Sequence, residues 1–165
     1  MLLERYQRIF GAFSRAARQV PDDRLVTWKS PERDRDLRQF LFHVYDRPDL
    51  MLQGLETGVY RYEDVLKAYD RAEAYETTSA LVDRGDELMA GVYAFLRTAT
   101  PERLAQPIDS YQGVLAIGEL LTLALGHAAH HLRQLYHYFG ILGITPDRPL
   151  VDRDFEGIAM PAKLF

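Results

Sequence analysis

The sequence predicts an all-α fold: a four-helix bundle with an irregular C-terminal tail, formed by residues 1–165 as a single domain. A chain of 165 residues is long enough to bury one hydrophobic core and short for two. Hydrophobic residues make up 47% of the chain and charged residues 27%, which is typical of a globular protein. Four long segments repeat apolar residues at helical spacing, and we find no convincing strand. Four such helices in one domain are expected to pack as a bundle.

The first two helices are predicted from their apolar stripes. Helix one is expected over residues 2–19, and Pro21 with the two aspartates after it should end it. Helix two should begin near Glu32 and continue into the fifties. Pro48 lies within that stretch, and we expect a kink or a break there, because proline lacks the backbone N–H and clashes with the preceding turn.

A glycine-containing connector separates helix two from helix three. It includes a short helical patch over residues 64–69. Helix three is expected over residues 77–98, and Thr100 followed by Pro101 indicates a short helical turn after it.

The fourth helix is the longest, over residues 114–139. Gly140 and Gly143 should stop it. The remaining residues, 144–165, contain several prolines and glycines, so we expect an irregular tail that lies over the bundle.

The composition excludes several classes of function. The chain has no cysteine, which excludes disulfides, thiolate metal sites, iron–sulfur clusters and a cysteine nucleophile. The net charge of −4 and the lack of a long basic run argue against binding to nucleic acid or an anionic membrane. The N-terminal segment lacks the apolar core of a signal peptide, and no apolar stretch approaches the ~18 residues of a membrane span. We therefore expect a cytoplasmic protein.

The histidines of the fourth helix are the clearest candidates for a functional site. With each residue turning the helix by about 100°, His131 lies only about 40° from His127, on the apolar side that should face the bundle. Two imidazoles one turn apart can bind one cation. Burying them is costly unless their ring nitrogens have partners, and a metal ion would satisfy them. The alternative is a pair of buried histidines that hydrogen-bond to neighbouring groups.

A third ligand is available on the second helix. His43 lies at the edge of the apolar stripe there, where it could face the fourth helix or remain at the exposed boundary. Three histidines from two helices would leave an open coordination position for water or substrate. A di-iron carboxylate site is excluded, because Phe40 and Ala124 occupy the positions three residues before His43 and His127, where that site needs glutamate.

The motif around these histidines resembles that of the DinB/YfiT-like superfamily. Residues 127–135 read His-Ala-Ala-His-His-Leu-Arg-Gln-Leu, which is similar to the H-x-x-H-H-x-x-Q motif of that family and to its H-x-R-Q-L subgroup. Trp28, followed by Asp36-Leu37 and then His43, resembles the way the family enters its second helix. The chain segments around 142–147 and 157–161 are also similar to that subgroup, so the resemblance covers most of the chain in order.

The resemblance implies a metalloenzyme. The family's metal would be held by His43, His127 and His131, the same three residues that the helical spacing selects. Zinc and nickel are the leading candidates for the cation, with iron or manganese as alternatives. The better-understood branches of the family are similar to thiol-dependent S-transferases that use bacillithiol, mycothiol or another low-molecular-weight thiol.

Three further residues are candidates for the pocket. Gln134 lies about 20° from His127 and could hydrogen-bond a ligand or orient a neighbouring group, or simply pack. Asp36 could accept the outer N–H of a ligand histidine, or lie solvated at the surface. Trp28 could form a wall of the pocket or belong to the core. We identify no separate general base in the helices.

The sequence supports two functional hypotheses and one bland alternative. The first is a divalent-metal-dependent enzyme acting on a small electrophilic molecule, a thiol transferase or a metal-assisted hydrolase or isomerase. The second is a non-catalytic, stress-related bundle that binds a metal or small molecule in a closed site. The third is a plain bundle with buried neutral histidines. Members of the family are often dimers, and the flanking face of His130, His137 and Glu119 could form such an interface; we expect a structural or interface role for His130.

Overall fold

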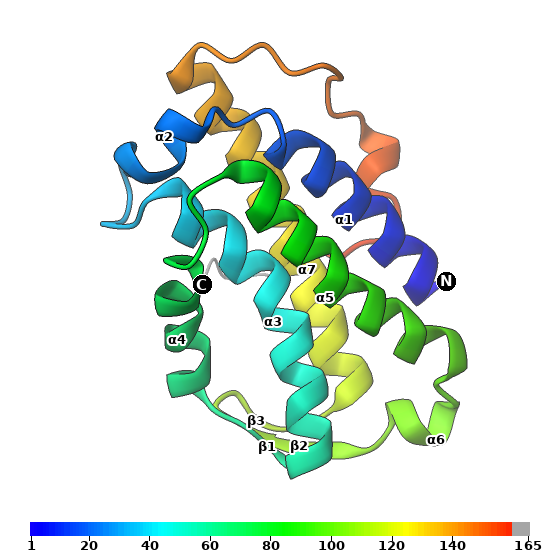
Figure 1. The fold of residues 1–165 in the computed structure, drawn as a ribbon. Helices are drawn as coiled ribbons and strands as arrows, with labels where there is room; N and C mark the ends of the chain where they lie inside the picture. Colours follow the sequence, from blue (N-terminus) through cyan, green and yellow to red (C-terminus); the bar gives the residue numbers. More distant parts are fainter. Residues whose placement is uncertain (160–165) are drawn as a thin grey trace.

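Four long helices lie side by side and form the body of the molecule (Figure 1). The computed structural model describes residues 1–159. The long helices are α1 (Leu2–Ala17), α3 (Leu37–Thr57), α5 (Thr78–Thr98) and α7 (Ile117–Leu142). This arrangement confirms the predicted all-α bundle, with a small sheet added at one end.

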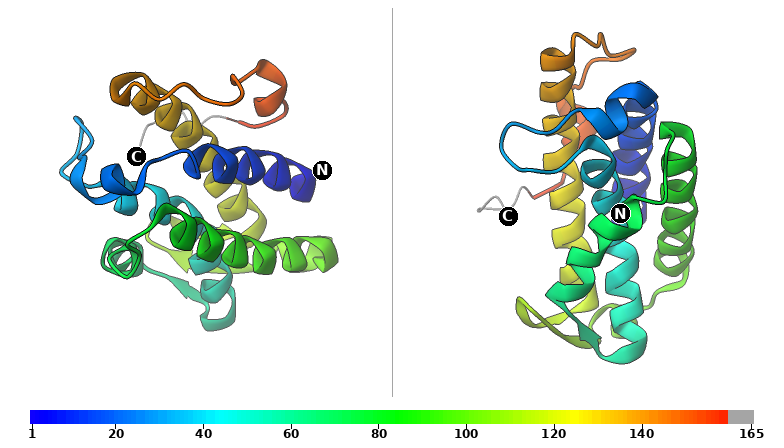
Figure 2. Two further views of the ribbon diagram at one scale, coloured as in Figure 1. Left: turned by 45° about the horizontal axis from the view of Figure 1, so that its top comes forward. Right: turned by 60° about the vertical axis from the view of Figure 1, so that its left-hand side comes forward.

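The helix contacts explain where the core lies. Helix α1 packs against α5 and α7, while α3 packs against α5, α7 and the shorter helix α4 (Tyr62–Ala72). Figure 2 shows the same packing from two other sides, with α4 on the outer side of α3. The largest fully buried side chains are mostly aromatic, and all but one of these aromatic residues come from α1, α3 and α7: Tyr6, Phe10, Phe13, Phe40, Tyr45, Tyr138 and Phe139, with Tyr60 from the segment after α3.

Helix α3 begins later than predicted because Asp36 caps it. The Asp36 carboxylate accepts a hydrogen bond from the backbone N–H of Gln39 at 2.8 Å, and the Gln39 side chain accepts from the backbone N–H of Asp36 at 3.2 Å. This reciprocal capping box fixes the first turn. The residues from Glu32 to the cap, which we expected to be helical, form a loop instead. A short helix that the sequence analysis did not anticipate, α2 (Asp22–Thr27), precedes this loop.

Helix α3 also runs through Pro48 without ending, so of the expected kink or break the break is wrong. Proline removes one intrahelical hydrogen bond and is unfavourable in isolation. The segment around Pro48 is buried and packs against neighbouring helices. Tertiary packing therefore outweighs the local preference, as it commonly does.

A three-stranded sheet closes one end of the bundle, and the sequence analysis missed it (Figure 1). Strand β2 (Pro107–Ser110) lies in the middle; it pairs in parallel with β1 (Val59–Tyr60) and antiparallel with β3 (Gly113–Ala116). These strands have two to four residues, too few for alternation to be recognised. Residues 114–116, predicted as the start of helix four, belong to β3.

The remaining segments follow the prediction more closely. Thr100 caps the short helix α6 (Pro101–Leu104). Helix α7 passes Gly140 and ends at Gly143, which adopts a left-handed conformation with φ of 69°. The tail returns to α1 through a 3₁₀ helix, η1 (Asp152–Phe155). The end of the predicted tail, residues 160–165, lies outside the described residues.

Candidate metal centre

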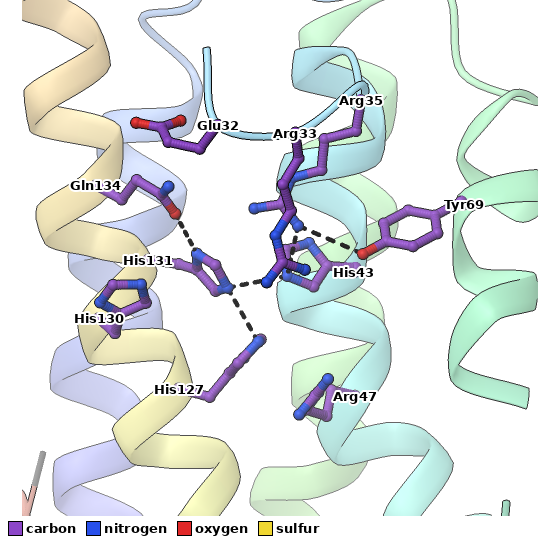
Figure 3. A pocket seen from close by; sticks show the side chains of 10 residues that line it. All are labelled: Glu32, Arg33, Arg35, His43, Arg47, Tyr69, His127, His130, His131 and Gln134. Carbon is purple, nitrogen blue, oxygen red and sulfur yellow. Dashed lines mark hydrogen bonds between the residues drawn. The ribbon is translucent and has the colours of Figure 1, made fainter. Parts of the chain in front are cut away.

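A cavity of about 350 Å³ opens between α3 and α7, on the side where α4 packs. Figure 3 shows its lining, which combines imidazole rings from both long helices with guanidinium groups from α3 and the loop before it. The lining residues are Glu32, Arg33, Arg35, His43, Arg47, Tyr69, His127, His130, His131 and Gln134.

Three buried histidines meet at the base of this cavity. Nε2 of His131 lies 3.0 Å from Nε2 of His43 and 3.0 Å from Nε2 of His127. The candidate ligand atoms of the three rings all lie within 4.8 Å of one another. Each residue is at most 6% exposed. The structure thus brings together the three histidines that the sequence singled out, and together they could hold a metal ion.

Hydrogen bonds on the far side of two rings define their protonation. Nδ1 of His43 lies 2.6 Å from the carbonyl oxygen of Phe40, and Nδ1 of His131 lies 2.7 Å from Oε1 of Gln134. Because these oxygens accept hydrogen bonds, each Nδ1 is assigned the ring proton and donates it. In a neutral imidazole the Nε2 atoms of both rings are then bare and carry lone pairs.

This donor set fits a divalent cation. Two bare nitrogens cannot hydrogen-bond to each other, so the 3.0 Å separation of Nε2 in His43 and His131 places two lone pairs in contact. A shared cation removes that repulsion. With Zn–N bonds of about 2.0–2.1 Å in tetrahedral geometry, ligand nitrogens lie about 3.3 Å apart, close to the 3.0 Å that separates Nε2 of His131 from Nε2 of His43 and of His127. Imidazole nitrogen suits zinc, copper, iron and nickel.

The electrostatics of the site keep the rings neutral. Burial lowers the pKa of His43, His127 and His131 well below the ordinary value of a histidine. The neighbouring ring of His131 lowers the pKa of His43 and His127 further, and the Arg35 guanidinium lowers that of His131. Neutral imidazole is the form that binds metal, so no proton has to leave at pH 7.

The three pocket candidates from the sequence fall in different places. Gln134 lines the cavity and holds the His131 ring. Asp36 does not contact any of the three clustered histidines, because its carboxylate caps α3 and pairs with Arg38 at 3.0 Å. Trp28 is absent from the cavity wall and packs on Tyr138, with ring centroids 4.8 Å apart.

The flanking face of α7 also differs from expectation. His130 was expected on a flanking face with a structural or interface role, yet it is half-buried, lines the cavity and has its ring centroid 5.0 Å from that of His131. The cavity therefore extends from the face of α7 that carries His127 and His131 to the side that carries His130. Glu119 caps α7 by accepting a hydrogen bond from the backbone N–H of Ala116 at 2.9 Å. His137 is exposed.

Sequence reasoning missed the arginines of the cavity, Arg33, Arg35 and Arg47. A usable signal existed for Arg47, which lies four residues after His43 and therefore on the same face of α3. No comparable signal marked Arg33 and Arg35, because the loop that carries them was predicted as helix. Tyr69 reaches the cavity from α4, whose packing against α3 the sequence did not reveal.

Comparison with known proteins gives one match. A family model described as the DinB superfamily matches residues 5–135, a range that contains all three histidines of the cluster. Neither the curated proteins nor the solved structures yielded a match. None of the helices in residues 1–159 is both long and apolar enough to cross a membrane.

Proposed function

This chain belongs to the DinB superfamily, and from its buried histidine cluster we propose that it is a divalent-metal-dependent enzyme, a thiol-dependent S-transferase that acts on small electrophilic molecules. The observation that carries the proposal is the convergence of Nε2 atoms from His43, His127 and His131 at the base of a cavity. Zinc or nickel would suit this all-imidazole set.

The chain's own residues prepare the site for its cation. The Phe40 carbonyl and the Gln134 side chain orient the rings of His43 and His131, which turns their Nε2 lone pairs inward. When bound, a divalent cation supplies the Lewis acidity that lowers the pKa of a water or thiol and makes it nucleophilic near neutral pH. The apolar packing behind the rings, including Phe40 edge-on to His131 at 5.2 Å, fixes their positions.

The surroundings favour catalysis over a closed structural site. In the part of the chain that the structure describes, the cluster contains three candidate ligands and no fourth, so a cation held there would remain accessible to a molecule in the cavity. A volume of about 350 Å³ is sufficient for a small molecule. Burial lowers the pKa of His130 at the cavity wall, so its ring is neutral at pH 7 and can accept a proton from substrate.

An activity assay tests this function. Metal-loaded protein is incubated with a set of low-molecular-weight thiols and a reactive aryl halide, and the thioether product is measured by mass spectrometry. We expect product above the uncatalysed rate with at least one thiol, lost in His131→Ala and retained in the exposed control His137→Ala. Full metal loading without turnover of any thiol would instead favour the non-catalytic binding protein.

A further inference from the structure

Arg35 is a buried cation with few hydrogen-bond partners for its N–H donors. Arg35 is only 6% exposed, and arginine is rarely buried without an acidic partner. Its Nη1 lies 3.4 Å from the Tyr69 hydroxyl and 3.5 Å from Nε2 of His43, both long contacts. Its Nε is buried and has no hydrogen-bond partner among the described residues. The guanidinium offers five N–H donors, so most of its capacity remains.

Within residues 1–159, no carboxylate forms an ion pair with this charge. The ion pairs found within residues 1–159 do not include Arg35. Arg33 and Arg47 line the same cavity, and Glu32 is the one carboxylate in its described lining. Glu32 already accepts a hydrogen bond from Tyr138 at 2.8 Å. Among the described lining residues guanidinium groups therefore outnumber carboxylates, and a buried charge such as that of Arg35 is costly unless a ligand pairs with it.

We infer that Arg35 forms an oxyanion subsite, and that the substrate or thiol which enters this cavity carries a carboxylate or phosphate group. The guanidinium fork matches two oxygens of such a group, and its contact with His43 places it directly beside the ligand nitrogens. The cation–π contact of Arg35 with the Phe40 ring, 5.0 Å from the centroid, holds the fork in place. The inference rests on the proposed function and names the chemical class that the site accepts.

Calorimetric titration with simple probes tests the subsite. Phosphate, acetate and the neutral analogue acetamide are titrated into wild type, Arg35→Gln and the exposed control Arg84→Gln, each metal-free and metal-loaded. The metal-free arm separates the contribution of Arg35 from that of the cation, and comparing phosphate with acetate identifies the preferred oxyanion. We expect Arg35→Gln to bind the oxyanion at least tenfold more weakly with unchanged metal content, Arg84→Gln to match wild type, and acetamide not to bind.

Wild-type oxyanion affinity in Arg35→Gln would overturn the inference, and so would acetamide binding as strongly as acetate. Metal-loaded wild type that binds neither phosphate nor acetate also rejects the subsite, while leaving the metal centre intact. Wild type that fails to take up metal rejects the proposed function, and the metal-free titration still decides the role of Arg35. As a check that does not need calorimetry, phosphate should raise the melting temperature of wild type and leave that of Arg35→Met unchanged; equal shifts would again reject the subsite.

Discussion

The ring of His131 takes its orientation from Gln134, three residues further along α7. Its Nδ1–H donates to the Gln134 side-chain oxygen, so the opposite nitrogen faces His43 and His127. An outer partner of this kind fixes both the tautomer and the direction of a ligand lone pair. The same is true of His43, where the partner is a backbone carbonyl that mutation cannot remove.

Replacing Gln134 should weaken metal binding without removing it. In Gln134→Leu the Nδ1–H of His131 loses its acceptor, and we expect zinc affinity to fall by about 10- to 100-fold. Competition with a chromophoric chelator measures this change. The exposed glutamine of α3 supplies the control Gln53→Leu, which should bind zinc like wild type. Unchanged affinity in Gln134→Leu would mean that the glutamine has no role at the site.

The buried histidines should make the metal-free protein sensitive to acid. Their pKa values are lowered in the folded state, chiefly by burial, so below about pH 6.5 the unfolded chain binds protons that the folded chain does not. The free energy of unfolding should therefore be highest above pH 6.5 and fall as the pH decreases, by up to about 1.4 kcal/mol per pH unit for each histidine.

Urea unfolding between pH 7.5 and 5.5 measures this slope. The substitution His127→Asn should make it shallower, whereas His137→Asn, on the exposed face, should leave it as in wild type. A free energy of unfolding that does not change over this range would contradict the assignment of the three buried histidines as neutral in the folded protein.

At the scale of elements, the capping of α3 positions the site. Asp36 starts the helix, His43 follows two turns later, and Arg35 lies immediately before the cap. The capping box fixes the first turn against the loop that carries Arg33 and Arg35. A change at the cap should thus affect both stability and the wall of the cavity.

The substitution Asp36→Ala should destabilise the protein by about 1–2 kcal/mol, because it removes the cap of α3 and the partner of Arg38. Chemical denaturation followed by circular dichroism gives the value. The control is Asp34→Ala, in the same loop, where the side chain is 85% exposed; it should change stability by less than about 0.5 kcal/mol. Equal effects of the two substitutions would show that the cap contributes nothing.

The elements that the sequence predicted well are those with long periodic stripes. Helices α1, α5 and α7 were found within a few residues because their apolar positions repeat over four or more turns. The break predicted at Pro48 does not occur, because the cost of proline in a helix is local and the packing that offsets it comes from distant segments. The strands escaped detection because a ladder of four residues depends on its partner strand rather than on its own pattern.

The candidate site likewise combines residues that a single helix places together with residues whose position depends on how separate segments pack. The spacing of His127 and His131 follows from one turn of one helix, so the sequence alone placed them together. His43 was placed by its helical face and by the family resemblance. The roles of Arg35 and Tyr69 depend on how a loop and α4 fold against α3, which no periodicity encodes.

For the whole molecule, the histidine cluster joins α3 to α7, two helices that are separated in the sequence by residues 58–116. A cation held there would cross-link them through the core and would bind the folded chain only, because the unfolded chain does not assemble the three rings. We therefore expect this fold to assemble one metal site from His43, His127 and His131.

Elemental analysis of purified, tag-free protein shows whether this site exists. We predict about one divalent metal per chain in wild type and in His137→Ala, and a loss of that metal in both His43→Ala and His127→Ala. Metal retained by His43→Ala would place the site on α7 alone. No metal in wild type, even after dialysis against zinc or nickel, would contradict the account and leave a helical bundle with buried neutral histidines.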